Sequence, residues 1–92
     1  MEPNHVEGTK KGKVVLYTLS TCVWCKKTKN LLKKLGVEHY YYDVDLMKKV
    51  DKDKVLEEVK KHNPVATFPT LVIDDEYCIR GYKEDEIKEA LS

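Results

Sequence analysis

A run of apolar and β-branched residues leads directly into a helical pattern, and two cysteines stand at the junction. Residues 13–19, KVVLYTL, have the composition of a strand that is buried on both faces. After two polar residues, apolar side chains recur at helical spacing as far as Leu35, and Gly36 supplies a stop signal. This order predicts a strand that turns at once into an amphipathic helix, with Cys22 at or next to the N-cap of that helix and Cys25 one turn inside it.

The patterns that follow predict three more strands and two more helices. Residues 38–44 read as a strand, and a second helical stretch runs from about residue 50 to residue 62. Residues 70–74 and 76–81 predict a hairpin around an acidic turn, and residues 84–91 predict a short amphipathic helix. The order β-α-β-α-β-β-α combines parallel crossovers with a hairpin. It therefore predicts an α/β fold, in which helices flank a four-stranded mixed sheet.

The length of 92 residues suits one domain with one core. Residues 1–12 are polar and lack apolar periodicity, so we expect a flexible N-terminal segment before a folded domain at 13–92. With 17 basic and 16 acidic residues, the charge gives no reason to expect binding to nucleic acid or to an anionic membrane. The apolar stretches are strand-sized and the N-terminus lacks the apolar core of a signal peptide, so we expect a cytoplasmic protein without a membrane span.

The two cysteines form a C-x-x-C motif at the start of the first predicted helix. Unpaired backbone N–H groups and the positive end of the helix dipole stabilise an anion there, which favours the thiolate of Cys22. Cys25 lies one turn further into the helix. This arrangement predicts a catalytic pair in which Cys22 attacks a disulfide and Cys25 resolves the mixed disulfide.

A C-x-x-C is also half of a zinc site, and an iron–sulfur cluster shared by two chains would need two such pairs. The other candidate ligands are a single distant Cys78 and three histidines without ligand spacing, His5, His39 and His62. We therefore predict no metal site in this chain, although a metal or cluster carrier stays open as an alternative. A lone strand cysteine such as Cys78 is usually a small buried hydrophobic residue.

Two further groups of residues have simple structural interpretations. The lysines of the first helix are expected to form a solvated face, with a docking surface for an acidic partner as the alternative; they are Lys26, Lys27, Lys29, Lys33 and Lys34. The aromatic run Tyr40-Tyr41-Tyr42 is expected to pack within the sheet.

Three segments, YTLSTCVWC, TFPTLVID and IRGYKEDEI, together resemble the glutaredoxin family of the thioredoxin superfamily, over the span from Lys13 to Leu91. The resemblance implies a thioredoxin fold and a dithiol redoxin that carries electrons to protein disulfides. It also implies a cis Phe68-Pro69 bond beside Cys22, where the Phe68 backbone would pair with an extended substrate. Thr21, Trp24, Gly81 and Tyr82 are the further substrate-binding candidates.

The tail of the chain bears on the branch of the family. Glutathione-using glutaredoxins typically have Gly-Gly, a small residue and an aspartate where this chain has Arg80-Gly81-Tyr82-Lys83. This stretch is more similar to the NrdH-redoxins, which donate electrons to ribonucleotide reductase. Leu19 stands where many glutaredoxins have a lysine, and Trp24 stands where they favour tyrosine.

These departures lead us to expect a monomeric reductant that does not depend on glutathione and has no cofactor beyond a Cys22–Cys25 disulfide. A separate disulfide reductase would be its electron donor. Its clients would be disulfide-containing proteins, and ribonucleotide reductase is one candidate. A conventional glutathione-dependent glutaredoxin is the alternative.

Overall fold

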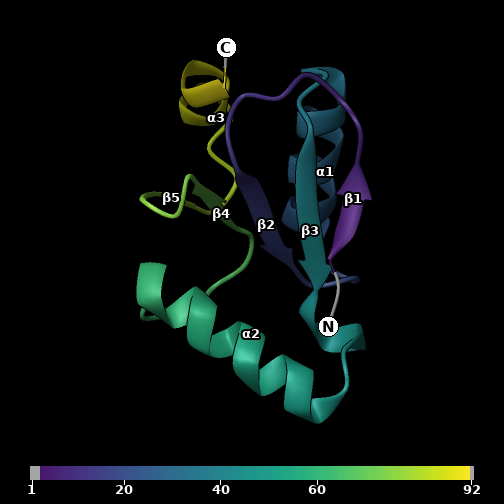
Figure 1. Ribbon diagram of the computed structural model, residues 1–92, viewed down its shortest axis with the longest axis vertical. Helices are drawn as coiled ribbons and strands as arrows, with labels where there is room; N and C mark the ends of the chain where they lie inside the picture. The colour runs from purple at the N-terminus through teal and green to yellow at the C-terminus, as the bar shows by residue number, and fades with distance from the viewer. Residues whose placement is uncertain (1–2, 92) are drawn as a thin grey trace.

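The computed structural model describes residues 3–91 and confirms the predicted α/β order (Figure 1). Its elements are β1 (Asn4–Val6), β2 (Val14–Thr18), α1 (Val23–Lys34), β3 (His39–Asp43), the short 3-10 helix η1 (Val44–Leu46), α2 (Lys49–His62), β4 (Thr70–Ile73), β5 (Tyr77–Arg80) and α3 (Glu84–Leu91).

One mixed sheet contains all the strands, in the order β1-β3-β2-β4-β5. The central strand β2 is parallel to β3, with Thr18 opposite Asp43, and antiparallel to β4, with Tyr17 opposite Thr70. Strand β5 continues the sheet as an antiparallel neighbour of β4. Because β2 and β3 are parallel, the C-terminal ends of both strands lie at the same edge of the sheet, next to the start of α1.

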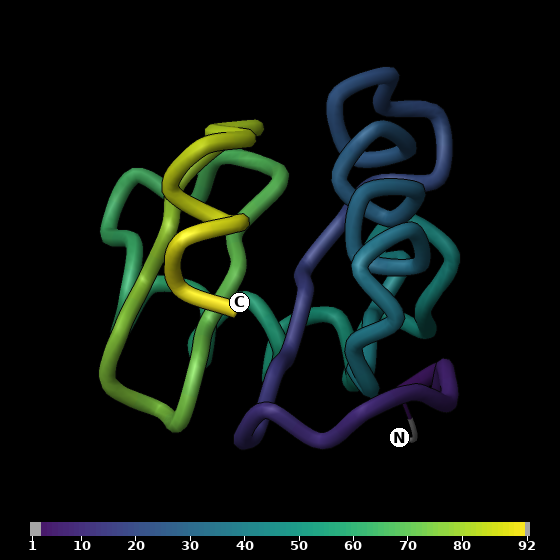
Figure 2. Tube along the Cα trace, turned by 90° about the horizontal axis from the view of Figure 1, so that it is seen from above, coloured from purple at the N-terminus to yellow at the C-terminus, as the bar shows by residue number. Residues whose placement is uncertain are grey.

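Side chains alternate between the two faces of β2, and each face is covered by different helices. Leu16 belongs to the core that α1 and α3 cover, together with Leu32 and Ile87. The next residue, Tyr17, belongs to the core beneath α2, where it meets Val59. Figure 2 shows α1 and α3 on the same side of the sheet. The sheet is thus a central layer with helices on both faces.

The sheet has one strand more than the four predicted. Asn4–Val6 pairs with β3 in antiparallel register, and the ring of His5 packs 4.9 Å from the ring of Tyr40 between centroids. The segment expected to be flexible over 1–12 thus contains a strand that the sequence did not predict, while its residues 1 and 2 lie outside the described ones. A three-residue polar strand is too short to show the alternation from which strands are predicted.

The predicted acidic hairpin is present between β4 and β5. Asp74 and Asp75 both have positive φ, at 56° and 58°, and the Glu76 N–H donates to the Ile73 carbonyl over 3.2 Å. This is the geometry of a type I′ turn, and aspartate tolerates it better than most residues with a side chain. The Asp74 carboxylate also accepts the N–H of Lys13 over 2.8 Å, which ties the turn to the start of β2.

Candidate active site

Cys22 is the N-cap residue of α1. Its backbone is extended, with φ −83° and ψ 120°, and its Sγ accepts the N–H of Cys25 over 3.3 Å. The Cys22 side chain is partly exposed and no acidic residue lies in the first turn of the helix. The sulfur therefore lies at the positive end of the helix dipole, within reach of both solvent and the unpaired N–H groups.

Cys25 lies one turn further along α1 and is completely buried, with 0% of its surface exposed. The pKa of the Cys25 thiol is raised to about 12, chiefly by burial and also by the neighbouring Cys22 thiol, whereas the Leu19 N–H and Lys29 act against the rise. The Leu19 N–H donates to Cys25 Sγ over 3.5 Å. All three cysteines are free thiols. The pair is thus asymmetric, with one accessible sulfur and one shielded sulfur.

The loop that delivers Cys22 is held by a carboxylate that the sequence patterns did not indicate. Asp45, in η1, accepts the N–H of Ser20 over 2.8 Å and also the hydroxyl of that residue. These hydrogen bonds lower the pKa of the Asp45 carboxyl. Because Ser20 and Asp45 are 25 positions apart, only the parallel pairing of β2 with β3 brings them together.

The Phe68-Pro69 peptide bond is cis, as the resemblance implied. Pro69 is buried, and its carbonyl accepts the N–H of Gly81 over 2.8 Å, so the proline loop and the segment after β5 lie together. The fully buried Asn63 supports the loop from behind, because its amide lies 3.0 Å from the hydroxyls of both Thr67 and Thr70.

Five of the six predicted substrate-binding residues line one pocket with a volume of about 230 Å³; they are Trp24, Phe68, Pro69, Gly81 and Tyr82. The rings of Trp24 and Tyr82 are stacked with their centroids 5.8 Å apart, and Lys27 Nζ lies 4.7 Å from the centroid of the Trp24 ring. The sixth residue, Thr21, is exposed in the turn before Cys22 and does not line this pocket.

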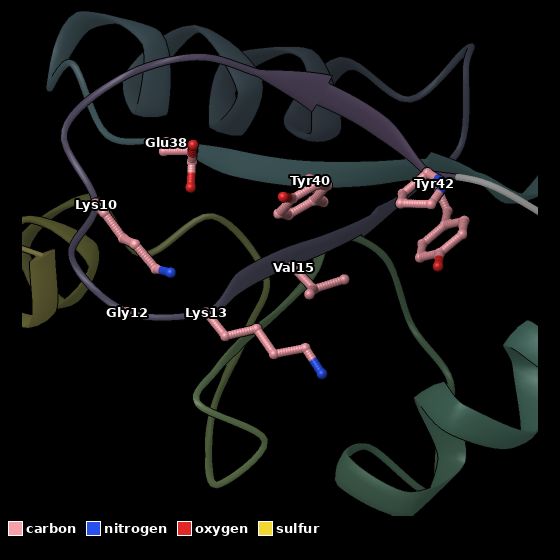
Figure 3. Close-up of a pocket in the computed structure, with 8 residues that line it drawn as sticks. Lys10, Gly12, Lys13, Val15, Glu38, Tyr40 and Tyr42 are labelled. Atoms are coloured by element: carbon pink, nitrogen blue, oxygen red, sulfur yellow. The ribbon is translucent and has the colours of Figure 1, made fainter.

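A larger groove, of about 430 Å³, opens over β2 and β3 (Figure 3). Figure 3 shows the rings of Tyr40 and Tyr42 along this groove, with Lys10 and Lys13 at its other side. Neither cysteine of the pair lines it. The smaller pocket does not include the cysteines either, but it is lined by Trp24, which lies between them in the chain, and by the proline loop, so it is the better candidate for binding a disulfide substrate.

Lys29 departs from the predicted solvated lysine face. Its Nζ lies 2.8 Å from Asp43 Oδ1, and the two side chains are only 22% and 16% exposed. Cys78 also departs from its prediction, because it is only partly buried in β5, opposite Val72. Within residues 3–91, no three histidine, cysteine or acidic side chains come close enough together to hold a metal ion.

The comparisons with known proteins agree with this geometry. The family model for glutaredoxin matches residues 14–78, which include both cysteines of the pair and the cis proline. The chain belongs to the glutaredoxin family. Proteins of this family are thiol-disulfide oxidoreductases that carry electrons through such cysteine pairs, and this glutaredoxin has the dithiol form of the site. The family match ends before the tail segment that begins at Arg80.

Solved structures and a curated relative extend the likeness over most of the chain. Methanoredoxin from Methanosarcina acetivorans is 49% identical with a TM-score of 0.91, over 92% of this chain and 90% of that one. A glutaredoxin from Methanosarcina mazei is 50% identical with a TM-score of 0.92, over 100% of this chain and 89% of that one. An uncharacterized glutaredoxin-like protein from the rubredoxin operon of Clostridium pasteurianum is 31% identical, over 80% of this chain and 91% of its own length. No helix in the described part of the chain is long and apolar enough to cross a membrane.

Proposed function

We propose that this glutaredoxin reduces disulfides in client proteins through Cys22 and Cys25, without depending on glutathione. The asymmetry of the two sulfurs supports the dithiol part of the proposal. Cys22 is partly exposed at the helix N-terminus, so it is the sulfur that a client disulfide can reach. Cys25 is fully buried one turn behind it, so it can react only with a disulfide already formed on Cys22.

The reaction consists of two exchanges. The Cys22 thiolate attacks one sulfur of the client disulfide, which forms a mixed disulfide and releases the other client sulfur as a thiol. Cys25 then loses its proton to water and attacks Cys22 Sγ, which releases the second client thiol and leaves a Cys22–Cys25 disulfide. Two electrons pass to the client, and a separate disulfide reductase returns them. No other cofactor takes part in the proposal.

The pocket beside the proline loop supports the second part, independence from glutathione. None of the five lining side chains carries a charge, and two of them are stacked aromatic rings. Glutathione carries two carboxylates and an ammonium group, and the lining residues offer them no ionic partner, although Lys27 lies over the Trp24 ring. An extended client segment suits the pocket better, because it pairs through backbone groups at Phe68 and adds apolar side chains.

Further parts of the proposal concern partners and place of action. We propose that the protein acts as a monomer in the cytoplasm on disulfide-containing proteins, and ribonucleotide reductase is the candidate client that the tail segment suggests. The tail runs Arg80-Gly81-Tyr82-Lys83 and contributes Gly81 and Tyr82 to the pocket.

A turnover assay with alternative electron donors tests the glutathione part. The oxidised protein is incubated with glutathione and glutathione reductase, and in parallel with a thioredoxin reductase or a small dithiol. We expect reduction by the dithiol or by the thioredoxin reductase and very slow reduction by glutathione. Rapid turnover with glutathione would overturn this part of the proposal and favour a conventional glutathione-dependent glutaredoxin.

A trapping experiment tests the dithiol part independently of the electron donor. Cys25→Ser should form a mixed disulfide with a client protein through Cys22 and stop there, so that it accumulates as one adduct per chain in a mass spectrum. Cys78→Ser is the matched control, because it also removes one thiol but lies in β5, apart from the cysteine pair at the start of α1, and it should turn over like the wild type. Full turnover by Cys25→Ser would show that Cys25 is not the resolving cysteine.

A further inference from the structure

Lys29, in the helix that carries Cys25, forms an ion pair with Asp43 at the end of β3. Lys29 Nζ lies 2.8 Å from Asp43 Oδ1 and 4.3 Å from the centroid of the Tyr41 ring. The hydroxyl of the fully buried Thr18 lies 2.7 Å from the same Asp43 oxygen. An aromatic ring and an anchored carboxylate therefore hold the ammonium group in one place.

The position of this ammonium group relates it to Cys25. Lys29 follows Cys25 by four positions in α1, so the two side chains start from the same face of the helix. Both lie on the side of the helix that turns toward the sheet, since Asp43 ends β3 and Thr18 ends β2. The other lysines of the helix are exposed, with Lys29 as the partly buried exception.

We propose that Lys29 is a positioning residue for the second exchange, in which its fixed positive charge stabilises the thiolate of Cys25 as this sulfur attacks the mixed disulfide. The inference rests on the proposed resolving role of Cys25. In the step, the Cys25 proton passes to water, a bond forms between Cys25 Sγ and Cys22 Sγ, and the bond from Cys22 to the client breaks. The client sulfur leaves with the electron pair and takes a proton from water.

The electrostatic surroundings of Cys25 are consistent with this role. Burial is the largest influence on its sulfur and raises the pKa, as does the Cys22 thiol, whereas the Leu19 N–H and Lys29 lower it. Once Cys22 is bound in a mixed disulfide it carries no charge. Lys29 then acts on the Cys25 sulfur as the positive member of its ion pair with Asp43, and the Tyr41 ring is its other contact.

The size of the effect follows from general thiol chemistry. A cation close to a thiol commonly lowers its pKa by about one unit, which is about tenfold in thiolate. The thiolate of a thiol with a lower pKa is also a weaker nucleophile. With a Brønsted coefficient of about 0.4–0.5, each thiolate reacts about threefold more slowly, which offsets part of that gain. Loss of the charge should therefore slow the second exchange about threefold.

The experiment measures the two exchanges separately. The first is followed as adduct formation in the Cys25→Ser background, and the second as client release from the preformed mixed disulfide by rapid quench. Lys29→Met should leave the first exchange unchanged and slow the second about threefold, while Lys29→Arg should restore it. Lys33→Met, which removes an equal charge from an exposed site on the same helix, should leave both exchanges unchanged.

A second variant distinguishes the charge from a merely structural role. Asp43→Asn loosens the same ion pair but keeps the cation and a hydrogen-bonding oxygen beside it, so it should not slow client release. Equal slowing by Asp43→Asn and Lys29→Met, or an unchanged rate in Lys29→Met, would overturn the proposal. If instead the wild-type mixed disulfide never releases its client, the resolving role of Cys25 is wrong. That result differs from client release at the same rate in the wild type and in Lys29→Met, which would contradict only the role of Lys29.

Discussion

The buried cysteine should be far less reactive than its neighbour, and this can be measured without any client. The perturbation is the double variant Cys22→Ser and Cys78→Ala, which leaves Cys25 as the single thiol of the chain. Cys25 is 0% exposed, and burial is the largest cause of its raised pKa of about 12. The folded variant should therefore react with iodoacetamide at pH 7 much more slowly than the same chain unfolded in guanidinium.

The magnitude follows from the shift in pKa from 9.0 to about 12. Three units correspond to about a thousandfold less thiolate at neutral pH. The more basic thiolate is the stronger nucleophile, and a Brønsted coefficient of about 0.4–0.5 makes each thiolate about twentyfold more reactive. The folded chain should therefore react about fortyfold more slowly than the unfolded chain. Removal of the Cys22 thiol relieves part of the shift in pKa, so we expect the folded chain to react at least about tenfold more slowly than the unfolded chain.

The assay follows loss of free thiol by mass spectrometry, at pH 7 and at equal reagent concentration for folded and unfolded chains. The rate of the unfolded chain divided by that of the folded chain should rise when the folded chain is stabilised by lower temperature, because reaction through transient opening then decreases. A folded rate within about threefold of the unfolded rate would refute the reasoning from burial. It would also remove the basis for assigning different roles to the two cysteines.

Three other substitutions test how the site and the fold are held. Because hydrogen bonds from Ser20 lower the pKa of Asp45, the contact should persist above the ordinary carboxyl range and be lost as pH falls through the lowered value. Asp45→Asn should therefore shift the Ser20 amide resonance at neutral pH, whereas the wild type should show this shift only in acid. Gly8→Ala would place a Cβ 2.6 Å from the Gly36 carbonyl oxygen, so the N-terminal segment should detach, at a cost of about 1–2 kcal/mol in urea unfolding. Leu32→Ala removes a fully buried side chain between α1 and the sheet and should lower the free energy of unfolding by about 2–5 kcal/mol.

The elements that the sequence predicts are those with a local signal. The β-branched run at 13–19 and the helical periodicity after it are properties of neighbouring residues, so β2 and α1 follow from the sequence alone. The same holds for the acidic hairpin. The cis bond before Pro69 is different, because most X-Pro bonds in folded proteins are trans and only the family resemblance indicated it.

The features that the sequence did not predict depend on residues far apart in the chain. Strand β1 is polar and only three residues long, so it is defined by its partner β3 and not by its own pattern. Lys29 looks like its neighbours in sequence, and only the contact with Asp43, fourteen positions away, separates it from the exposed lysines. Contacts of this kind need the sheet register, which composition and periodicity do not contain.

The register between β2 and β3 connects the fold to the chemistry. Because Thr18 pairs with Asp43, the last residue of β3 stands beside the last residue of β2, and the chain continues from both at the same edge. One continuation carries Cys22 and the other carries Asp45, so the loop and its carboxylate meet there. A slip of one residue would turn every side chain of the strand to the opposite face. The pairing of β2 with β3 that buries the core beneath α1 therefore also places the carboxylates of Asp43 and Asp45 at the edge of the sheet where the chain leads to the cysteines.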